Sequence, residues 1–453
     1  MPLHKILMPP QVEYAIRTLQ QAGFSAYIVG GCVRDALRGE IPHDWDLTTS
    51  AMPLQTKDCF RNETVIETGL KHGTVTVLID GMPLEITTYR IDGAYTDHRR
   101  PDAVTFTRNL RDDLSRRDFT VNAMAYHPDE GIIDLFGGQE DLARQRIACV
   151  GNPSERFDED GLRILRALRF SAVLDFTIAP DTAAAIHAQK ELLTGISAER
   201  IFSELSKLLC GIGAQRILRE YADVLFTILP DLAPMYRFDQ QNPHHCYDVY
   251  EHTLHAISAV PPEPMLRFAA LLHDSGKPSV FTKDERGGHF YGHAAVSTEI
   301  ARNVLHRLKS DRKTLDTVCR LVEYHDLVFP TPVSEKHLKR VISKLGFDHT
   351  EALLLLHRAD VSAQAESHRA ERIAHSNALL DTLAKLRAAD ECLTIQKLAV
   401  TGNDLINLGV PQGKRIGTLL RTLLEQVIDG IIPNEPAALL NAAEQYLNQQ
   451  KSG

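Results

Sequence analysis

The stretch that decides the fold is residues 26–50, which read AYIVGGCVRDALRGEIPHDWDLTTS. Its first four residues are a short apolar run typical of a buried β-strand, and Gly30-Gly31 ends that run. The residues from Val33 to Leu37 predict the start of a helix. Glycines between a strand and a helix let the backbone approach a phosphate, and the helix N-terminus offers free N–H groups. Arg34 would add a guanidinium donor to the same phosphates.

A pair of carboxylates follows in the same stretch. Asp44 and Asp46 flank Trp45, at the opening of a second predicted strand that runs from Trp45 to Thr49. Side chains two residues apart on a strand point to one face, so we expect the two carboxylates to lie together. They would repel each other unless a cation joined them, and hard oxygen ligands near phosphate favour Mg²⁺. Each half of this pattern alone is commonly structural, but together and in this order they favour nucleotidyl transfer.

Further β-prone runs lie at residues 64–67, 74–79 and 84–88, separated by Gly or Pro turns. An amphipathic helix is predicted at residues 10–22, before the first strand. A small mixed sheet with flanking helices accommodates these elements. Glu85 lies on the last run, within reach of the two aspartates, so we consider it as a third carboxylate. An exposed strand residue without a role is the equal alternative.

Composition places the chain among ordinary globular proteins, with 453 residues, 43% hydrophobic and 24% charged residues and a net charge of −9. This length predicts about two to four domains. We expect no membrane-spanning helix and no signal peptide, since no long apolar run and no secretory pattern occur. The seven cysteines lack a C-x-x-C pair, which predicts reduced thiols in a cytoplasm and no zinc knuckle. The net charge counts against nucleic-acid binding but does not exclude local arginine clusters.

The motif Gly30-Gly-x-Val-Arg-Asp35, followed by Asp44 and Asp46, resembles the head signature of class II tRNA nucleotidyltransferases. This family contains the CCA-adding enzymes and their poly(A) polymerase relatives. Residues 116–123, which read RRDFTVNA, are similar to the second head motif of the family. The resemblance implies that Arg117 contacts the nucleotide phosphates and that Asn122 and Asp118 brace the site.

The segment at residues 89–104 is rich in charge and contains Gly and Pro, as is typical of a mobile surface loop. The resembling family carries a flexible loop of this kind, with Arg-Arg-Pro-Asp before a valine. In that family the loop helps the site progress from C addition to A addition. The resemblance therefore counts against an enzyme that adds only C residues.

The second strong motif is residues 156–170, which read RFDEDGLRILRALRF. Apolar residues give a predicted helix its buried stripe, and charged residues recur every third position on the other face, namely Asp160, Arg163, Arg166 and Arg169. An Asp and an Arg one turn apart could read a base edge, while an intrahelical salt-bridge ladder is the ordinary explanation. The family uses this Glu-Asp-x-x-Arg element as a protein template for CTP and ATP. The resemblance therefore implies base recognition by Asp160 and Arg163, and nucleotide contacts by Arg166 and Arg169.

Histidines accumulate after residue 242, and a His-Asp pair follows an apolar run. Imidazole and carboxylate are a recurrent ligand set for a hydrolytic metal. The pattern resembles an HD-superfamily phosphohydrolase, although Ser275 stands where Ile is commoner. The resemblance implies the ligands His252, His273, Asp274 and a late aspartate, with His293 and His325 available for a second metal or for substrate. Both Asp326 and Asp360 fit as the late aspartate, and an inactive remnant of this fold is the alternative.

The motifs together predict an α+β protein. A nucleotidyltransferase head with a mixed sheet is expected at 1–146, and all-α parts are expected after it: a neck at 147–235, an HD-type body at 236–364 and a tRNA-binding tail at 365–453. The resemblance implies template-independent addition of C, C and A to tRNA 3′ ends from CTP and ATP. It implies Mg²⁺ as the head cofactor, and Mg²⁺ or a divalent transition metal at the HD site.

Other functions fit parts of the sequence. A poly(A) polymerase, or an enzyme that adds only A or only C residues, would share the head motifs. An alarmone synthetase-hydrolase also combines both domain types, but its HD domain comes first and the Gly30 motif is not its signature. A non-catalytic RNA-binding scaffold is disfavoured because the acidic pair and the Asp160–Arg163 element are intact.

Overall fold

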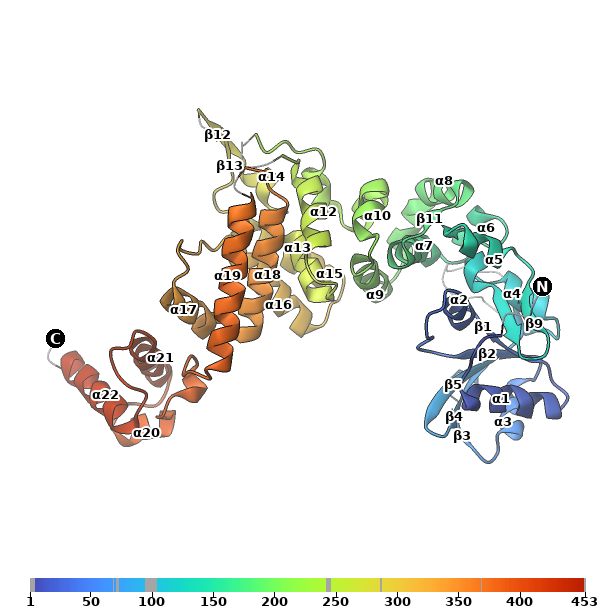
Figure 1. Ribbon diagram of the computed structural model, residues 1–453, viewed down its shortest axis with the longest axis horizontal. Helices are drawn as coiled ribbons and strands as arrows, with labels where there is room; N and C mark the ends of the chain where they lie inside the picture. Colours follow the sequence, from blue (N-terminus) through green and yellow to red (C-terminus); the bar gives the residue numbers. More distant parts are fainter. Residues whose placement is uncertain are drawn as a thin grey trace. The chain divides into compact units, whose positions relative to one another are not determined.

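The computed structural model describes residues 5–67, 69–70, 73–93, 104–241, 246–285, 287–367 and 369–451. The chain forms two units, 1–230 and 231–453 (Figure 1). The predicted fold class is confirmed, since a mixed sheet with helices is followed by mostly helical structure. The four-part division of the chain stays a prediction. Most of the expected mobile loop, residues 94–103, lies outside the described residues. Within the described ranges, no helix is both long enough and apolar enough to span a membrane.

The first unit begins with a seven-stranded sheet in the order β3-β4-β5-β2-β1-β8-β9. Its strands are β1 (Ala26–Val29), β2 (Asp46–Thr49), β3 (Thr64–Ile66), β4 (Thr74–Ile79), β5 (Met82–Thr88), β8 (Met124–His127) and β9 (Gly131–Asp134). β2 and β5 run parallel, and the other neighbours run antiparallel. The sheet is therefore mixed, as the sequence predicts. A separate two-stranded sheet pairs β6 (Arg90–Asp92) with β7 (Val104–Phe106).

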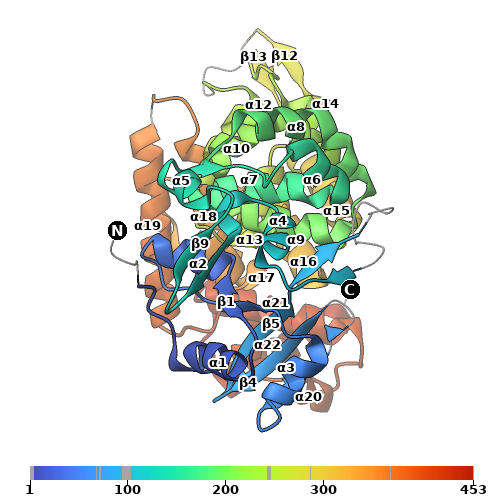
Figure 2. The ribbon, with the colours of Figure 1, turned by 90° about the vertical axis from the view of Figure 1, so that its right-hand side faces the viewer.

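The core of the head lies on both faces of this sheet, and all four residues of β1 are buried. Ala26 and Ile28 pack with the apolar face of α1 (Pro10–Gln21), and α3 (Pro53–Cys59) contacts β4 and β5 (Figure 1, Figure 2). Tyr27 and Val29 point to the other face and pack with Leu114 of α4 (Leu110–Ser115). A strand buried on both faces is continuously apolar, which explains the unalternating run at its start.

The rest of the first unit is helical. Its helices are α5 (Gly138–Ala143), α6 (Pro153–Glu159), α7 (Leu162–Leu174), α8 (Pro180–Gln189), α9 (Ala198–Leu209), α10 (Ala214–Glu220) and α11 (Ala222–Ile228), with the 3₁₀-helices η2 (Thr120–Asn122) and η3 (Lys190–Gly195). α7 packs against α9. A short parallel pair, β10 (Arg146–Ile147) with β11 (Thr177–Ile178), interrupts the expected all-α neck.

The sequence predicts Asp160 on the same helix as Arg163, Arg166 and Arg169, and the structure differs at this point. α6 ends at Glu159 and α7 begins at Leu162. Asp160 between them is extended, with φ −142° and ψ 102°. The next residue, Gly161, lies close to η3, where a Cβ would be 3.0 Å from the Cβ of Leu192. Asp160 therefore lies before the helix that carries the three arginines and not one turn along it.

The second unit is a helical array with one hairpin. Its helices are α12 (Val249–Ala259), α13 (Pro264–Leu272), α14 (Lys277–Val280), α15 (His293–Arg307), α16 (Arg312–Tyr324), α17 (Glu335–Leu345), α18 (Phe347–Ser362), α19 (Arg369–Ala388), α20 (Gly402–Asn407), α21 (Lys414–Ile428) and α22 (Pro436–Lys451). α12, α13, α16 and α18 pack together. The all-α prediction missed the hairpin of β12 (Thr282–Asp284) and β13 (Gly287–His289). Gly287 has φ 120°, a conformation that favours glycine and suits this turn.

Candidate active sites in the head and the body

The glycine turn after β1 lies against a guanidinium group. Gly30 adopts φ 80° and immediately precedes α2 (Gly31–Leu37). A Cβ on Gly30 would lie 3.1 Å from Nη1 of Arg117, so glycine serves both the positive φ and the close approach. Arg34 Nη1 donates to Oδ1 of Asn122 at 2.6 Å. The structure thus brings together the predicted phosphate-binding turn, both arginines and Asn122.

The head carboxylates are exposed at the start of β2 and on β5. Asp44 and Asp46 are both exposed, while Trp45 between them is buried, which agrees with the predicted shared face. Glu85 is the register partner of Asp46 across the parallel β2–β5 pair and is also exposed. Partial loss of water raises the pKa of Asp46, the Glu85 carboxylate raises it further, and Arg117 opposes both. We refer to Asp44, Asp46 and Glu85 as the head carboxylates.

A chain of buried polar contacts connects the glycine turn to α7. Asn122 Nδ2 donates to Oδ1 of Asp118 at 3.1 Å, and Arg166 Nε donates to Oδ2 of the same carboxylate at 2.9 Å. Burial raises the pKa of Asp118, but Arg166 and Asn122 outweigh it and lower the pKa to about 2. Arg34, Asn122, Asp118 and Arg166 therefore form one continuous network.

Sequence reasoning missed two acidic partners of the arginines. Glu204 on α9 is buried and lies 2.5 Å from Nε of Arg169, whose guanidinium stacks 3.8 Å from the centroid of Phe170. Asp113 on α4 is fully buried and lies 3.4 Å from Nη2 of Arg117. Glu204 lies on the apolar stripe of α9, and an acid on such a stripe signals a buried cation nearby.

The side chains of Asp160 and Arg163 contact different partners. The Asp160 carboxylate binds Arg200 at 2.7 Å and also accepts from the backbone N–H of Leu162 at 3.1 Å. Arg163 is buried, pairs with Glu159 and donates to the backbone oxygens of Arg156 and Arg116, at 3.0 Å each. Both predicted base-recognition side chains are therefore engaged within the protein, and a base would replace some of these contacts.

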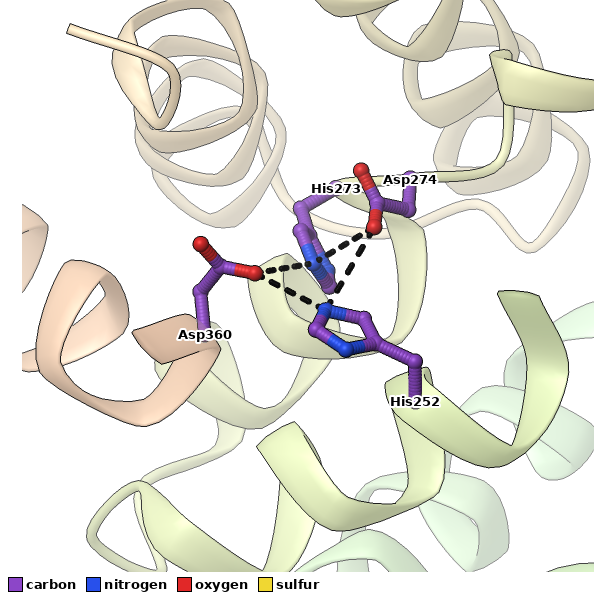
Figure 3. A group of neighbouring side chains, drawn as sticks. All are labelled: His252, His273, Asp274 and Asp360. Carbon is purple, nitrogen blue, oxygen red and sulfur yellow. Dashed lines mark hydrogen bonds and ion pairs between the residues drawn. The ribbon is translucent and has the colours of Figure 1, made fainter. Parts of the chain in front are cut away.

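A compact ligand cluster lies in the second unit. His252 of α12, His273 and Asp274 at the end of α13, and Asp360 of α18 place one ligand atom each within 4.8 Å of one another (Figure 3). His252 Nε2 lies 2.8 Å from Oδ1 of Asp360, and His273 Nε2 lies 3.2 Å from Oδ2 of Asp274. The side chains in Figure 3 converge on a common centre from three helices. The sequence predicted these residues, and Asp360 is the late aspartate in this group.

A second ligand group shares Asp274. Its other oxygen, Oδ1, lies 3.4 Å from Nε2 of His293 and 3.6 Å from Nε2 of His325. Each carboxylate oxygen of Asp274 thus faces a different group, as in a carboxylate that bridges two metal ions. Asp326 is exposed and lies in neither group. We call the two groups together the body cluster.

Backbone carbonyls orient the four imidazoles of the body cluster. The Nδ1 atoms contact the backbone oxygens of Ala363, Ala270, Phe290 and Val322, at 3.2 Å for His252, 2.8 Å for His273, 2.9 Å for His293 and 2.7 Å for His325. A carbonyl oxygen only accepts, so each Nδ1 carries the hydrogen. Nε2 is left to face the cluster, the arrangement seen in histidines that bind metal.

The electrostatics of the cluster call for positive charge at its centre. Nε2 of His273 and Oδ2 of Asp274 are buried and make no well-aligned hydrogen bond, although they lie 3.2 Å apart and Nζ of Lys277 lies 2.7 Å from the same oxygen. Burial lowers the pKa of His273, but Asp274 and Asp360 outweigh it and raise the pKa to about 10. The pKa of Asp274 lies well below its usual range despite burial, because of His273 and Lys277. Imidazole and carboxylate donors fit divalent transition metals at this position.

Known proteins resemble the chain along its length. The family model "Poly A polymerase head domain" matches residues 26–148, "Probable RNA and SrmB- binding site of polymerase A" matches 175–235, and "tRNA nucleotidyltransferase domain 2 putative" matches 290–443. A "CCA-adding enzyme" from Levilactobacillus brevis is 35% identical over 96% of this chain and 98% of its own length. One from Lacticaseibacillus paracasei is 34% identical over 96% and 97%. A crystal structure of the Bacillus stearothermophilus CCA-adding enzyme in complex with CTP has a TM-score of 0.74, with 30% identity over 98% of this chain and 100% of that one.

Proposed function

This chain belongs to the family of CCA-adding enzymes, and on that premise we propose that it adds C, C and A to tRNA 3′ ends from CTP and ATP. The observation that carries the proposal is the polar network from the glycine turn to α7, together with Arg117, which lies against that turn and lowers the pKa of Asp46. The network connects a site for phosphates to a helix suited to reading a nucleotide. The seven cysteines are free thiols, as expected of a cytoplasmic enzyme.

The proposed reaction is nucleotidyl transfer. The tRNA 3′-hydroxyl attacks the α-phosphorus of the nucleotide, a new O–P bond forms, the bond to the β-phosphate oxygen breaks, and pyrophosphate and the hydroxyl proton leave. Asp44 and Asp46 would hold Mg²⁺, with Glu85 as a third carboxylate. Mg²⁺, when bound, supplies charge stabilisation at the phosphates and lowers the pKa of the hydroxyl. The turn at Gly30 and the guanidinium groups nearby would position the triphosphate.

Nucleotide selection is assigned to the segment around the start of α7. Asp160 and Arg163 would meet the base edge, and Arg166 and Arg169 would support the nucleotide from the next two turns. The Asp160–Arg200 pair is partly exposed, so an incoming base can reach and replace it. Arg166 is fixed by Asp118, so binding at α7 and binding at the glycine turn are coupled through one carboxylate.

A second activity is proposed for the body cluster, namely metal-dependent hydrolysis of a phosphate ester. The two ligand groups that share Asp274 carry this proposal. Water would attack phosphorus, the ester P–O bond would break, and the alcohol would leave with a proton. The metal ions, when bound, supply Lewis-acid stabilisation of the phosphoryl oxygens. Lys277, with Nζ 2.7 Å from Oδ2 of Asp274, balances charge beside the carboxylate that both ligand groups share.

The test of the main activity is an extension assay with the full chain. Purified protein is incubated with tRNA lacking its 3′ CCA, Mg²⁺ and labelled CTP or ATP, alone and together. Addition of C, C and A that requires both nucleotides supports the proposal. Extension that stops after the C residues indicates a CC-adding enzyme, and ATP-only extension of tRNA ending in CC indicates an A-adding one. A long A tail on general RNA indicates a poly(A) polymerase.

A further inference from the structure

A cavity of about 320 Å³ opens beside the body cluster. Its lining includes the cluster residues His325 and Asp360, so the cavity reaches the edge where the two ligand groups meet. Phe329 after α16, Gln364 after α18 and Arg372 on α19 form other parts of its wall. Ligand pockets commonly measure about 300–1,000 Å³, so this one suits a small molecule.

Arg372 supplies a positively charged side chain to the wall of this cavity. Its side chain is exposed and donates to Oε1 of Gln364, whose Nε2 donates to Oδ2 of Asp360 at 3.1 Å. Among the described residues, no carboxylate lies within ion-pair distance of Arg372. A guanidinium carries five N–H donors, so most of its donors remain for a ligand. A planar fork of donors is suited to two oxygens of one phosphate group.

The histidines and the phenylalanine in the cavity wall are held in place by hydrogen bonds and ring packing. His375 Nε2 lies 2.9 Å from the backbone oxygen of Pro330, and His357 Nδ1 lies 3.1 Å from Oγ of Ser376. The ring of Phe329 packs edge-on against His357, with centroids 5.7 Å apart. The cavity therefore combines a fixed aromatic side with a cationic side next to the ligand cluster.

The carboxylates of Asp326 and Glu371 also line the cavity. Without metal ions, these groups and Asp360 disfavour an anion there. With two divalent ions on the cluster, positive charge at the inner end would exceed the negative charge of the wall. Anion binding in this cavity is therefore expected to require a metal-loaded cluster.

We propose that this cavity is the substrate pocket of the body cluster and that Arg372 binds the phosphate of a small phosphate ester. The alcohol part of that ester is no larger than a nucleoside, in keeping with the cavity volume. This inference rests on the proposed hydrolytic function. Arg372 adds a ligand-binding role to α19, outside the helices that carry the cluster.

The test uses the full chain loaded with Mn²⁺ and inorganic phosphate as the probe. Metal content is measured by mass spectrometry, and phosphate affinity is measured by titration calorimetry. Arg372→Ala is expected to keep the wild-type metal content and to lose phosphate affinity about 10- to 100-fold, because a charge-assisted pair is lost. Arg372→Lys keeps the positive charge but lacks the planar pair of N–H donors, so its phosphate affinity should lie between those of the wild type and Arg372→Ala.

The matched control is Arg387→Ala. Arg387 lies on the same helix and pairs with Asp348 and Glu351 away from the cavity, so its loss should leave phosphate affinity unchanged. Unchanged phosphate affinity in Arg372→Ala would overturn the pocket assignment. Gln364→Ala removes the direct contact with Asp360 and serves as the comparison for metal content. If Arg372→Ala loses as much metal as Gln364→Ala, the pocket assignment is also overturned, because Arg372 would then only position Asp360. A wild-type chain that binds no Mn²⁺ would instead overturn the hydrolase proposal, and the pocket assignment with it.

Discussion

The head carboxylates and the body cluster both gather acidic side chains, yet they are built in opposite ways. Asp44, Asp46 and Glu85 are exposed, and among the described residues no three-ligand group within 4.8 Å includes them. The body cluster is largely buried and assembles two such groups around Asp274. Mg²⁺ usually keeps several waters and binds through a few carboxylates plus substrate phosphates. On the proposed function, nucleotide would complete the head site, whereas the body cluster brings its ligand atoms together before substrate arrives.

The local chemistry of the two sites follows this difference. In the head, the raised pKa of Asp46 comes from partial loss of water and from the Glu85 carboxylate, and a cation arriving with the nucleotide relieves both. In the body, carbonyl-bound imidazoles already hold their Nε2 atoms toward the centre. A permanently bound metal suits the second design, and a metal exchanged at each cycle suits the first.

Removing a head carboxylate should have the largest effect. We expect Asp44→Ala to lower CTP and ATP incorporation by roughly a thousandfold or more, because the Mg²⁺ that binds the phosphates would lose a ligand. Binding of tRNA, measured by filter retention, should change little. Asp58→Ala, at an exposed position on α3, is the matched control. Incorporation at the wild-type rate in Asp44→Ala would contradict the account.

Removing a body ligand should be the next largest effect. We expect His273→Ala to lower the metal content of the body cluster and to reduce phosphate-ester hydrolysis by about a hundredfold. Removing a residue that only supports a metal ligand typically costs about 10- to 100-fold, and removing a ligand costs at least as much. Metal analysis and a hydrolysis assay measure this. His306→Ala, at an exposed position on α15, is the control. Full metal retention in His273→Ala would show that this histidine is not a ligand.

The buried ion pair between Asp118 and Arg166 of α7 should stabilise the folded chain to an extent that depends on pH. Asp118→Ala removes the closer partner of Arg166 and leaves only Glu204 at 3.9 Å, so it should lower the free energy of unfolding by about 3 kcal/mol near neutral pH. The Asp118 pKa is about 2 in the folded chain against 3.8 as its ordinary value, so its contribution is present above pH 4 and is lost as the pH falls toward 2. Urea unfolding of both proteins over this range should show the difference shrinking. A difference that does not change with pH would contradict this assignment.

The smallest effect is expected at Asp326. Asp326→Asn should leave metal content unchanged and alter hydrolysis by less than about fivefold, since this carboxylate lies outside both ligand groups. Asp360→Asn, the matched change within the cluster, should lower metal content clearly. Equal metal loss in both variants would remove the distinction between the two aspartates.

Local patterns predicted much of the fold. The strands at 26–29 and 74–79 are confirmed with the expected bounds, and the helix at 10–22 differs by one residue at its end. The helix at 10–22 has helical periodicity, the strand at 26–29 is a continuous apolar run, and glycine or proline marks the boundaries of both. The break at Asp160 was not predicted, because charged residues recur every third position from Asp160 to Arg169.

Residue types predicted the composition of the sites better than their geometry. The register that sets Glu85 beside Asp46 could only be proposed from the sequence, since it depends on which strands pair. Glu204, a partner of Arg169 that is distant in sequence, was missed for the same reason. The sequence could not decide whether Asp326 or Asp360 belongs to the ligand group. The structure decides it, because α12 packs against α18 and brings Asp360 to His252.

The most direct test of this contrast is the metal content of the purified chain after extensive dialysis, with and without CTP. We predict about two tightly held divalent ions per chain without nucleotide, bound by the body cluster, and additional Mg²⁺ only when CTP is present. The double variant Asp44→Ala/Asp46→Ala should keep the first pair and lose the CTP-dependent ions. A dialysed chain without bound metal, or head carboxylates that hold Mg²⁺ without nucleotide, would contradict the account.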